Sequence, residues 1–387
     1  MDASFRDRLA RLRRETPARA DASAANASSE GSSSEPCAEP ESASESDAPR
    51  AAPDAELPSW WKARVARGAP AAQLPPALDV GPPTDLREAH SVRGAFAVRE
   101  LRVALEQPHG AEPLARVLDV RSELFALLTG DARLAALDPR RALFLDIETT
   151  GLSGGAGTKA FLVGLGWIEA GEFVLWQGFL RGPEEEAALL EEVAQRVAGA
   201  QALVTFFGKT FDRHRLEDKM RVHGVRPPFE GRAHLDLYHP LRALYRPALA
   251  DARLGTLERV LCSVEREDDL SGAHAPAAWY DFLAGRPHRL ERVFAHNRDD
   301  VLSLAALCAH LGSLEFAPRA VAVTQEPSRS LEWARLRGLA RALARHKRWS
   351  ECATLASAAR ELALEEHACE LDELIVKATR RALKQHA

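Results

Sequence analysis

Residues 143–151 read Leu-Phe-Leu-Asp-Ile-Glu-Thr-Thr-Gly, an apolar run that contains two acids two positions apart. In a β-strand the side chains at i and i+2 point to the same face, so Asp146 and Glu148 would lie close together. Two like charges this close repel strongly in a part-buried site unless a cation lies between them. Because hard oxygen ligands favour Mg²⁺ or Mn²⁺ over zinc, the stretch predicts a divalent-metal site. Taken alone, such a pair also occurs as a solvated acidic strand end.

The composition is typical of a globular protein. The chain has 387 residues, of which 46% are hydrophobic and 28% charged, enough for two or three structural units with a sizeable core. It contains no run of 18 or more apolar residues and no apolar signal segment, so we expect a soluble, cytoplasmic protein without a membrane partner. Its five cysteines show no C-x-x-C spacing, which argues against a disulfide framework and a structural zinc site.

The formal net charge of −5 is unevenly distributed. Residues 1–20 carry six arginines against three acids, and residues 21–56 carry nine acids against one arginine. The rest of the chain is therefore neutral. A neutral body has no general electrostatic attraction for nucleic acid, so any nucleic acid must be bound by local patches.

The first 139 residues divide into two parts. Residues 1–57 begin with a short basic helix and continue as an acidic linker of Ser, Ala, Glu and Pro, which we expect to be disordered. The basic helix is interpreted as a docking helix or a basic tail, with a membrane-surface or nucleic-acid arm as the alternative. Residues 58–139 form an accessory region, in which 91–105 alternate like one or two short strands and 112–129 resemble a helix.

Residues 140–313 show a regular succession of elements. Strands are predicted at 142–148, 160–168, 172–180, 202–207 and 233–238, and helices at 184–198, 211–223 and 288–312. Three strands in hairpin order, followed by alternating helices and strands, predict an α/β fold with a mixed five-stranded sheet flanked by helices. This is the element order of the ribonuclease H-like fold.

A third acid follows the predicted strand 202–207. The sequence Gly208-Lys-Thr-Phe-Asp places Asp212 at a helix start, near the carboxyl edge of the sheet, where open α/β sheets gather ligands. The alternative is an acid that only complements the helix dipole. Gly-Lys-Thr also resembles part of a P-loop, but that motif needs a glycine five residues earlier, where this chain has Leu203. An ATP-binding P-loop is therefore excluded.

The fourth acid lies within the predicted helix 288–312. His296 and Asp300 are four residues apart and therefore share one helix face. A single pair of this kind is often a surface ion pair. After the two earlier acidic motifs, it instead predicts a further metal ligand and a base.

These motifs together resemble the DEDD superfamily of 3′→5′ exonucleases, and more closely the YprB-type ribonuclease H-like proteins. The resemblance rests on 145–158, 208–212, 234–240, 254–258 and 296–304, and it spans about residues 140–313. It implies that the metal-binding acids are Asp146, Glu148, Asp212 and Asp300. It also implies hydrolysis of phosphodiester bonds in single-stranded DNA or RNA.

The expected mechanism uses two Mg²⁺ or Mn²⁺ ions roughly 3.5–4 Å apart, one activating water and one stabilising the leaving 3′ oxygen. Asp146 would bridge the ions, Glu148 and Asp300 would complete the nucleophile site, and Asp212 would serve the second ion. His296 is the candidate base. Superfamily members have either Tyr four residues or His five residues before the last acid, whereas this chain has His at the tyrosine spacing. His296 therefore acts as the base, orients the water or takes no part.

The resemblance also implies substrate contacts. The loop after the first strand would touch the terminal nucleotide through Thr149, Thr150 and Leu152. Lys209 would contact a phosphate and Phe211 would stack on a base, with core packing as the alternative for the aromatic ring. Asp236, in the strand 233–238, is interpreted as a structural residue near the acids rather than as a metal ligand.

Residues 319–387 are predicted to be helical and resemble tetratricopeptide-type hairpins, although the 34-residue pattern is incomplete. They either pack as a bundle on the catalytic domain or bind a protein partner. A different function for the whole chain is a catalytically silent nucleic-acid-binding or partner-recruiting protein that retains the fold. Because all four acids are present, the sequence favours an enzyme.

Overall fold

The computed structural model describes residues 79–151, 157–266, 270, 272–319 and 326–386. All of them lie in one of the two units into which the chain divides, residues 60–387. The predicted tail at 1–57, the start of the accessory region and Leu152 lie outside the described residues.

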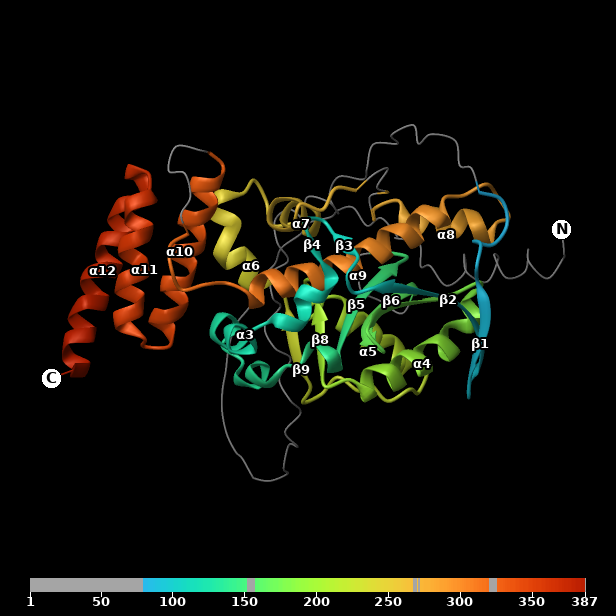
Figure 1. Cartoon of the computed structure of the whole chain (residues 1–387). Helices are drawn as coiled ribbons and strands as arrows, with labels where there is room; N and C mark the ends of the chain where they lie inside the picture. The colour runs from blue at the N-terminus through green and yellow to red at the C-terminus, as the bar shows by residue number, and fades with distance from the viewer. Residues whose placement is uncertain (1–78, 152–156, 267–269, 271, 320–325, 387) are drawn as a thin grey trace, which may run out of the picture. The chain divides into compact units, whose positions relative to one another are not determined.

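A mixed sheet of seven strands forms the centre of the described chain, in the order β1-β2-β7-β6-β5-β8-β9 (Figure 1). Neighbouring strands from β1 to β5 are antiparallel, whereas β5, β8 and β9 are parallel. The strands are β1 (Arg87–Ser91), β2 (Gly94–Ala104), β5 (Ala142–Thr149), β6 (Ala160–Glu169), β7 (Glu172–Phe179), β8 (Ala202–Thr205) and β9 (Ala233–Asp236). A separate hairpin consists of β3 (Pro108–His109) and β4 (Glu112–Pro113).

The expectation of a five-stranded sheet was wrong, because the region 91–105 contributes to the same sheet. Strand β2 pairs with β7 from Ala97 opposite Phe179 to Ala104 opposite Glu172, and β1 pairs with β2. Alternating hydrophobicity identifies a strand but does not say which strand it joins. Without β2, the edge of β7 would present unpaired backbone groups.

Helices cover both faces of the sheet. The helices are α3 (Ser122–Thr129), α4 (Glu186–Gly199), α5 (Asp212–Val222), α6 (Tyr238–Tyr245), α7 (Leu254–Cys262), α8 (Ala275–Leu283), α9 (Leu290–Gly312), α10 (Ser328–Arg345), α11 (Trp349–Leu362) and α12 (Glu365–His386). Gln177 of β7 donates to the backbone oxygen of Phe294 in α9, whereas a Cβ on the next residue, Gly178, would meet Leu189 of α4. Successive strand residues face opposite sides, so α9 and α4 lie on opposite faces (Figure 1).

Within the described residues, five 3₁₀ turns connect these elements, and one of them changes a predicted helix. They are η1 (Leu114–Asp119), η2 (Ala132–Ala136), η3 (Pro139–Arg141), η4 (Pro183–Glu185) and η5 (Arg246–Ala248). The helix expected over 112–129 is divided into η1 and α3 at Val120, whose backbone is extended. There Arg121 donates its backbone N–H to Gly312 at the end of α9. The tertiary contact thus interrupts a sequence that favours a helix, which still ends at Gly130 as expected.

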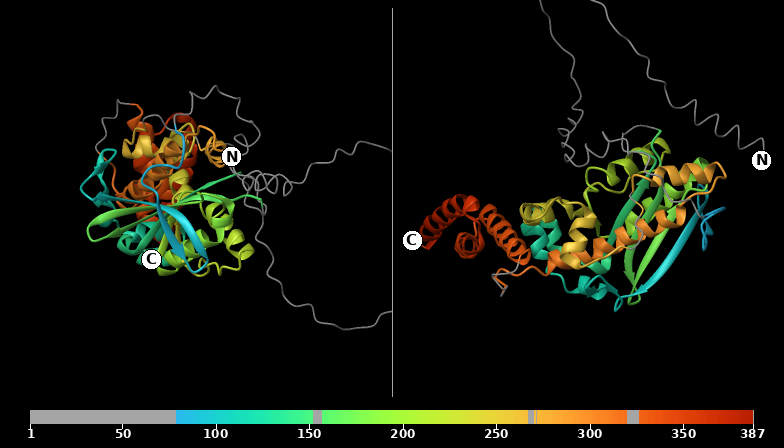
Figure 2. Two further views of the ribbon diagram at one scale, coloured as in Figure 1. Left: turned by 90° about the vertical axis from the view of Figure 1, so that its right-hand side faces the viewer. Right: turned by 90° about the horizontal axis from the view of Figure 1, so that it is seen from above.

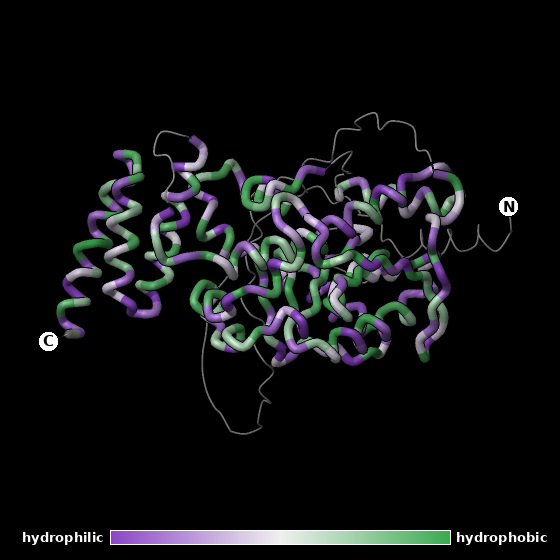
Figure 3. The backbone as a smooth tube through the Cα atoms, viewed as in Figure 1, coloured by the Kyte–Doolittle hydropathy of each residue, from purple (hydrophilic) through white to green (hydrophobic). Residues whose placement is uncertain are grey.

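The C-terminal helices α10, α11 and α12 follow one another, and α10 packs against α6 and α3 of the sheet domain (Figure 2). Hydrophobic residues dominate the central strands, whereas hydrophobic and hydrophilic residues alternate along these helices (Figure 3). Arg335 of α10 is buried and donates to Glu332 and to the backbone oxygens of Glu315 and Ala317, which follow α9. In the described part of the chain, no helix is long and apolar enough to cross a membrane.

Candidate functional site

Strand β5 carries the first two acids on one face in the middle of the sheet. It lies between β6 and β8, so that its backbone is paired on both sides. Asp146 is part-buried and Glu148 is buried, and the strand register shifts directly after Glu148. The sheet therefore holds both carboxylates on an interior strand and on one of its faces, as the D-x-E spacing predicts.

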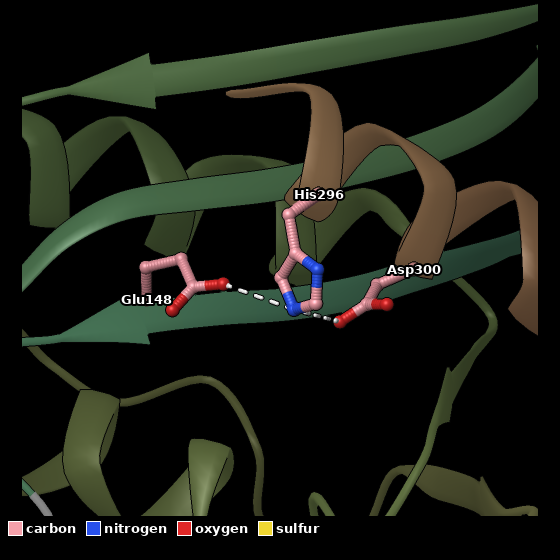
Figure 4. Close-up of side chains that lie close together, drawn as sticks. All are labelled: Glu148, His296 and Asp300. Atoms are coloured by element: carbon pink, nitrogen blue, oxygen red, sulfur yellow. Dashed lines mark ion pairs between the residues drawn. The ribbon is translucent and has the colours of Figure 1, made fainter. Parts of the chain in front are cut away.

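Helix α9 brings His296 and Asp300 to the same place (Figure 4). The Nε2 atom of His296 lies 3.9 Å from Oε1 of Glu148 and 3.5 Å from Oδ2 of Asp300. One ligand atom from each of these three residues lies within 4.8 Å of the others. The imidazole therefore lies between two carboxylates that come from elements about 150 residues apart in the chain.

The remaining acid, Asp212, is the first residue of α5 and is buried. The turn that leads to it requires Gly208, because a Cβ there would lie 2.5 Å from the side chain of Thr205 and 2.9 Å from Oδ2 of Asp212. Phe207, between β8 and this glycine, has a positive φ of 63°, which is unusual for an aromatic residue. The strand-to-turn geometry thus directs Asp212 toward the sheet.

The four acids repel one another electrostatically. Burial raises the pKa of Asp146 well above its usual range, and the charges of Asp300, Asp212 and Glu148 raise it further. Burial likewise raises the pKa of Asp212, and Asp236, Glu148 and Asp300 add to this effect. A protein that gathers so much negative charge is stabilised by bound cations, and the oxygen donors match Mg²⁺ or Mn²⁺.

Asp236 is not free to act as a ligand in the same way. Its carboxylate accepts the backbone N–H groups of Phe207 (2.8 Å), Lys209 (3.0 Å) and Tyr238 (3.1 Å). These bonds fix the turn before Asp212, which is the structural role that the sequence suggested. They also end β9 at Asp236, so the strand is shorter than the predicted range 233–238, and α6 begins at Tyr238.

Sequence reasoning missed an amide network that holds Asp146. Nδ2 of Asn297 donates to Oδ2 of Asp146 (2.9 Å), and Nε2 of Gln177 donates to Oδ1 of Asn297 (2.9 Å). Asp146, Gly164 and Gln177 lie opposite one another on β5, β6 and β7. A Cβ on Gly164 would come within 2.3 Å of Oδ1 of Asn297, so only glycine allows this approach. The nearest sequence signal was the position of Asn297 directly after His296.

Sequence reasoning also missed Arg266, which contacts Asp300. Nη2 of Arg266 lies 2.7 Å from both Oδ1 of Asp300 and Oε2 of Glu258, and its Nε lies 2.6 Å from Oε1 of Glu258. Burial lowers the pKa of Arg266, but Asp300 and Glu258 outweigh this effect and raise it overall. The available signal was the motif 254–258, which ends in Glu258 and to which we assigned no role.

Arg266 also touches His296. Its Nη1 lies 3.4 Å from Nδ1 of His296. A guanidinium has no acceptor, so Nδ1 must be the acceptor in this contact. The proton of a neutral imidazole is then on Nε2, the atom that faces Glu148 and Asp300.

Two of the predicted substrate-binding residues, Thr149 and Thr150, lie at the end of β5 and directly after it, and two others, Lys209 and Phe211, lie between β8 and α5. Thr149 Oγ1 donates to the backbone oxygen of Gly151 (2.9 Å), and Thr150 Oγ1 accepts the backbone N–H of Lys159 (3.0 Å). Burial lowers the pKa of Lys209, and Phe211 is 9% exposed within the hydrophobic core. Contacts of these side chains with a nucleotide stay predictions.

Comparisons with known proteins agree with this fold. The family model of the RNase_H superfamily matches residues 143–312. The chain is 31% identical to YprB of Bacillus subtilis (strain 168), an uncharacterized protein, over 221 residues that make up 55% of this chain and 52% of YprB. The chain thus spans about half the length of the curated relative it matches. Residues 143–312 are therefore similar to the ribonuclease H superfamily, and about half of the chain is similar to YprB.

Proposed function

We propose that the protein is a metal-dependent 3′→5′ exonuclease that hydrolyses single-stranded DNA or RNA. The observation that carries this proposal is the convergence of four acids from β5, α5 and α9, with His296 between two of them. The ribonuclease H superfamily match supports nuclease chemistry. The 3′→5′ polarity and the preference for single strands rest on the resemblance to the DEDD exonucleases.

The donor set fits two divalent cations of the Mg²⁺ type. The four carboxylates Asp146, Glu148, Asp212 and Asp300 would hold them, because like charges in a buried cluster need positive charge nearby and carboxylate oxygens are the preferred ligands of these ions. When bound, such ions activate water and stabilise charge on the leaving oxygen.

The residues of the chain supply orientation. The Asn297 amide holds one oxygen of Asp146 and leaves the other to bind elsewhere. His296 lies next to Glu148 and Asp300, where its Nε2–H would orient the attacking water. We further propose that Thr149, Thr150, Leu152, Lys209 and Phe211 contact the terminal nucleotide.

The test is a panel of end-labelled single- and double-stranded DNA and RNA oligonucleotides, incubated with the full chain and Mg²⁺, Mn²⁺ or chelator. We expect mononucleotides to be released from the 3′ end of single strands only when metal is present. The matched control is Asp218→Asn, which removes an exposed acid on α5 and should leave cleavage unchanged. Binding without cleavage under every condition would favour the alternative, a silent nucleic-acid-binding protein.

We also propose that the C-terminal helices are a bundle attached to the catalytic domain. Helix α10 packs on α6 and α3, which agrees with a bundle attached to the catalytic domain. Whether α11 and α12 also recruit a protein partner stays a prediction, as does the cytoplasmic location.

A further inference from the structure

Arg266 is the feature that the proposed reaction does not use. Its side chain is 9% exposed and lies between two carboxylates. One of them, Asp300, is a proposed metal ligand, and the other, Glu258, belongs to α7 and is 1% exposed. The guanidinium is a permanent cation, so it places a positive charge where a divalent ion would approach Asp300.

Glu258 holds the arginine independently of Asp300. Two nitrogens of the guanidinium contact both oxygens of Glu258, at 2.6 and 2.7 Å. This two-point geometry is the strongest pairing that arginine makes with a carboxylate. Burial raises the pKa of Glu258 overall, although Arg266 and the Ser303 hydroxyl both favour its charged form and so lower it, and this hydroxyl lies 2.8 Å from Nε2 of His109. Glu258 therefore has fixed partners behind it.

The contact with Asp300 is different in kind, because only Nη2 reaches that carboxylate. If an ion binds Asp300, Arg266 loses one contact but keeps both of its contacts with Glu258. The arrangement therefore has a fixed end at Glu258 and an exchangeable end at Asp300.

We propose that Arg266 is a tethered counter-cation that competes with a divalent metal ion for Asp300 and so lowers the affinity of the site for that ion. This inference rests on the proposed metal site. Arg266 acts through Asp300 and is thus a positioning residue: it neutralises and orients this carboxylate in the metal-free protein and gives it up when an ion binds. Asp146, which a neutral amide holds, has no such competitor among its described partners.

The test measures Mn²⁺ binding to the metal-free full chain by isothermal titration calorimetry. The main variant is Arg266→Gln combined with Glu258→Gln, which removes the buried Glu258 carboxylate together with its cation, so that only the part-buried Asp300 loses its partner. Because the removed guanidinium contacts Asp300 itself, whereas the removed Glu258 carboxylate contacts the guanidinium, the loss of the competing cation should outweigh the loss of the anion. We therefore expect the Kd for Mn²⁺ to fall, by about tenfold. The control removes an exposed ion pair on α11, Arg348→Gln with Glu351→Gln, and should leave the Kd unchanged.

A second variant keeps the experiment decisive if the double variant does not fold. Arg266→Lys keeps the charge, but a single ammonium cannot hold both carboxylates as a guanidinium does. We expect its Kd to lie between those of the parent and the double variant. Thermal unfolding in chelator provides a readout without metal, in which Arg266→Lys should melt at a lower temperature than the parent.

The outcomes separate this inference from the proposed function. If the parent binds Mn²⁺ and the Arg266 variants bind it equally or more weakly, the competition is refuted while the metal site stands. If the parent does not bind Mn²⁺ at all, the metal site itself and the inference built on it are both wrong.

Discussion

The two sides of the acid cluster are held by opposite means. Asp146 accepts a hydrogen bond from the neutral amide of Asn297, whereas Asp300 pairs with the cationic Arg266. The neutral partner orients Asp146 without cancelling its charge, and the pKa of Asp146 is raised by burial and by the other three acids. The charged partner compensates Asp300 within the protein. The site thus contains one carboxylate with a neutral hydrogen-bond partner, Asp146, and another that is paired with a cation of the protein, Asp300.

The largest loss of activity is expected from substitution of Asp146, whose hydrogen-bond partner Asn297 is neutral. Asp146→Asn should reduce metal-dependent cleavage below about 1% of the parent rate. Mutation of a residue that only hydrogen-bonds to a metal ligand typically costs about 10- to 100-fold in activity, and loss of a ligand itself should cost more. Glu148→Gln should behave in the same way. The assay is release of labelled mononucleotide with Mg²⁺ or Mn²⁺. Parent-like cleavage by Asp146→Asn would end the two-metal interpretation.

His296 lies between the two sides, and its removal should be nearly as harmful. If it serves as base or holds the attacking water, His296→Ala should lower the rate by about 10²–10⁴. His296→Tyr is the informative second variant, because the DEDD exonucleases, which the chain resembles, include members with tyrosine at this spacing. Recovery with tyrosine would assign the position to orienting water by a hydrogen bond, which agrees with the proton on Nε2 that the Arg266 contact requires. If His296→Ala cleaves as fast as the parent, the histidine takes no part.

The amide support of Asp146 can be broken without touching any acid. In Gly164→Ala the new methyl group would lie 2.3 Å from Oδ1 of Asn297, so the amide must move away from Asp146. We expect a rate loss of about 10- to 100-fold, typical of residues that orient metal ligands. Gly199→Ala, where a Cβ meets nothing within 4 Å, is the matched control. Equal rates for both variants would show that the amide does not position Asp146.

The contrast between the two sides also explains what the sequence could predict. Asp146, Glu148, Asp212 and His296 with Asp300 were predicted as site residues because each lies at a fixed local spacing in a strand, at a helix start or on a helix face. The same local logic predicted five strands of the sheet. Such spacing patterns report only on residues that are close together in the chain.

The partners that hold the acids are distant in sequence. Asn297 meets Asp146 across 151 positions and Gln177 across 120, and only the pairing of β5, β6 and β7 brings them together. Arg266 is an ordinary charged residue in a loop until α7 and α9 lie side by side. The strand β2 was recognised as a strand but not as part of this sheet, for the same reason. These contacts depend on the register of the strands and on the packing of distant elements, which a local sequence pattern does not reveal.

The smallest expected effect compares the stability of the two sides directly. In chelator, Asp146→Asn should hold or slightly raise the melting temperature, because it removes a carboxylate whose charge the folded state disfavours. Asp300→Asn should lower it by a few degrees, since Arg266 loses an anionic partner.

The pH dependence of this difference follows from its sign. A raised pKa means that folded Asp146 binds its proton more tightly than the unfolded chain, so its penalty grows as the pH rises above the ordinary range of the carboxyl group. The gain from Asp146→Asn should therefore shrink as the pH is lowered toward 4. Differential scanning fluorimetry of both variants and the parent in chelator, at several pH values, measures this. If both substitutions shift the melting temperature in the same direction, the two sides are not held by opposite means, and the contrast between a neutral and a charged partner is wrong.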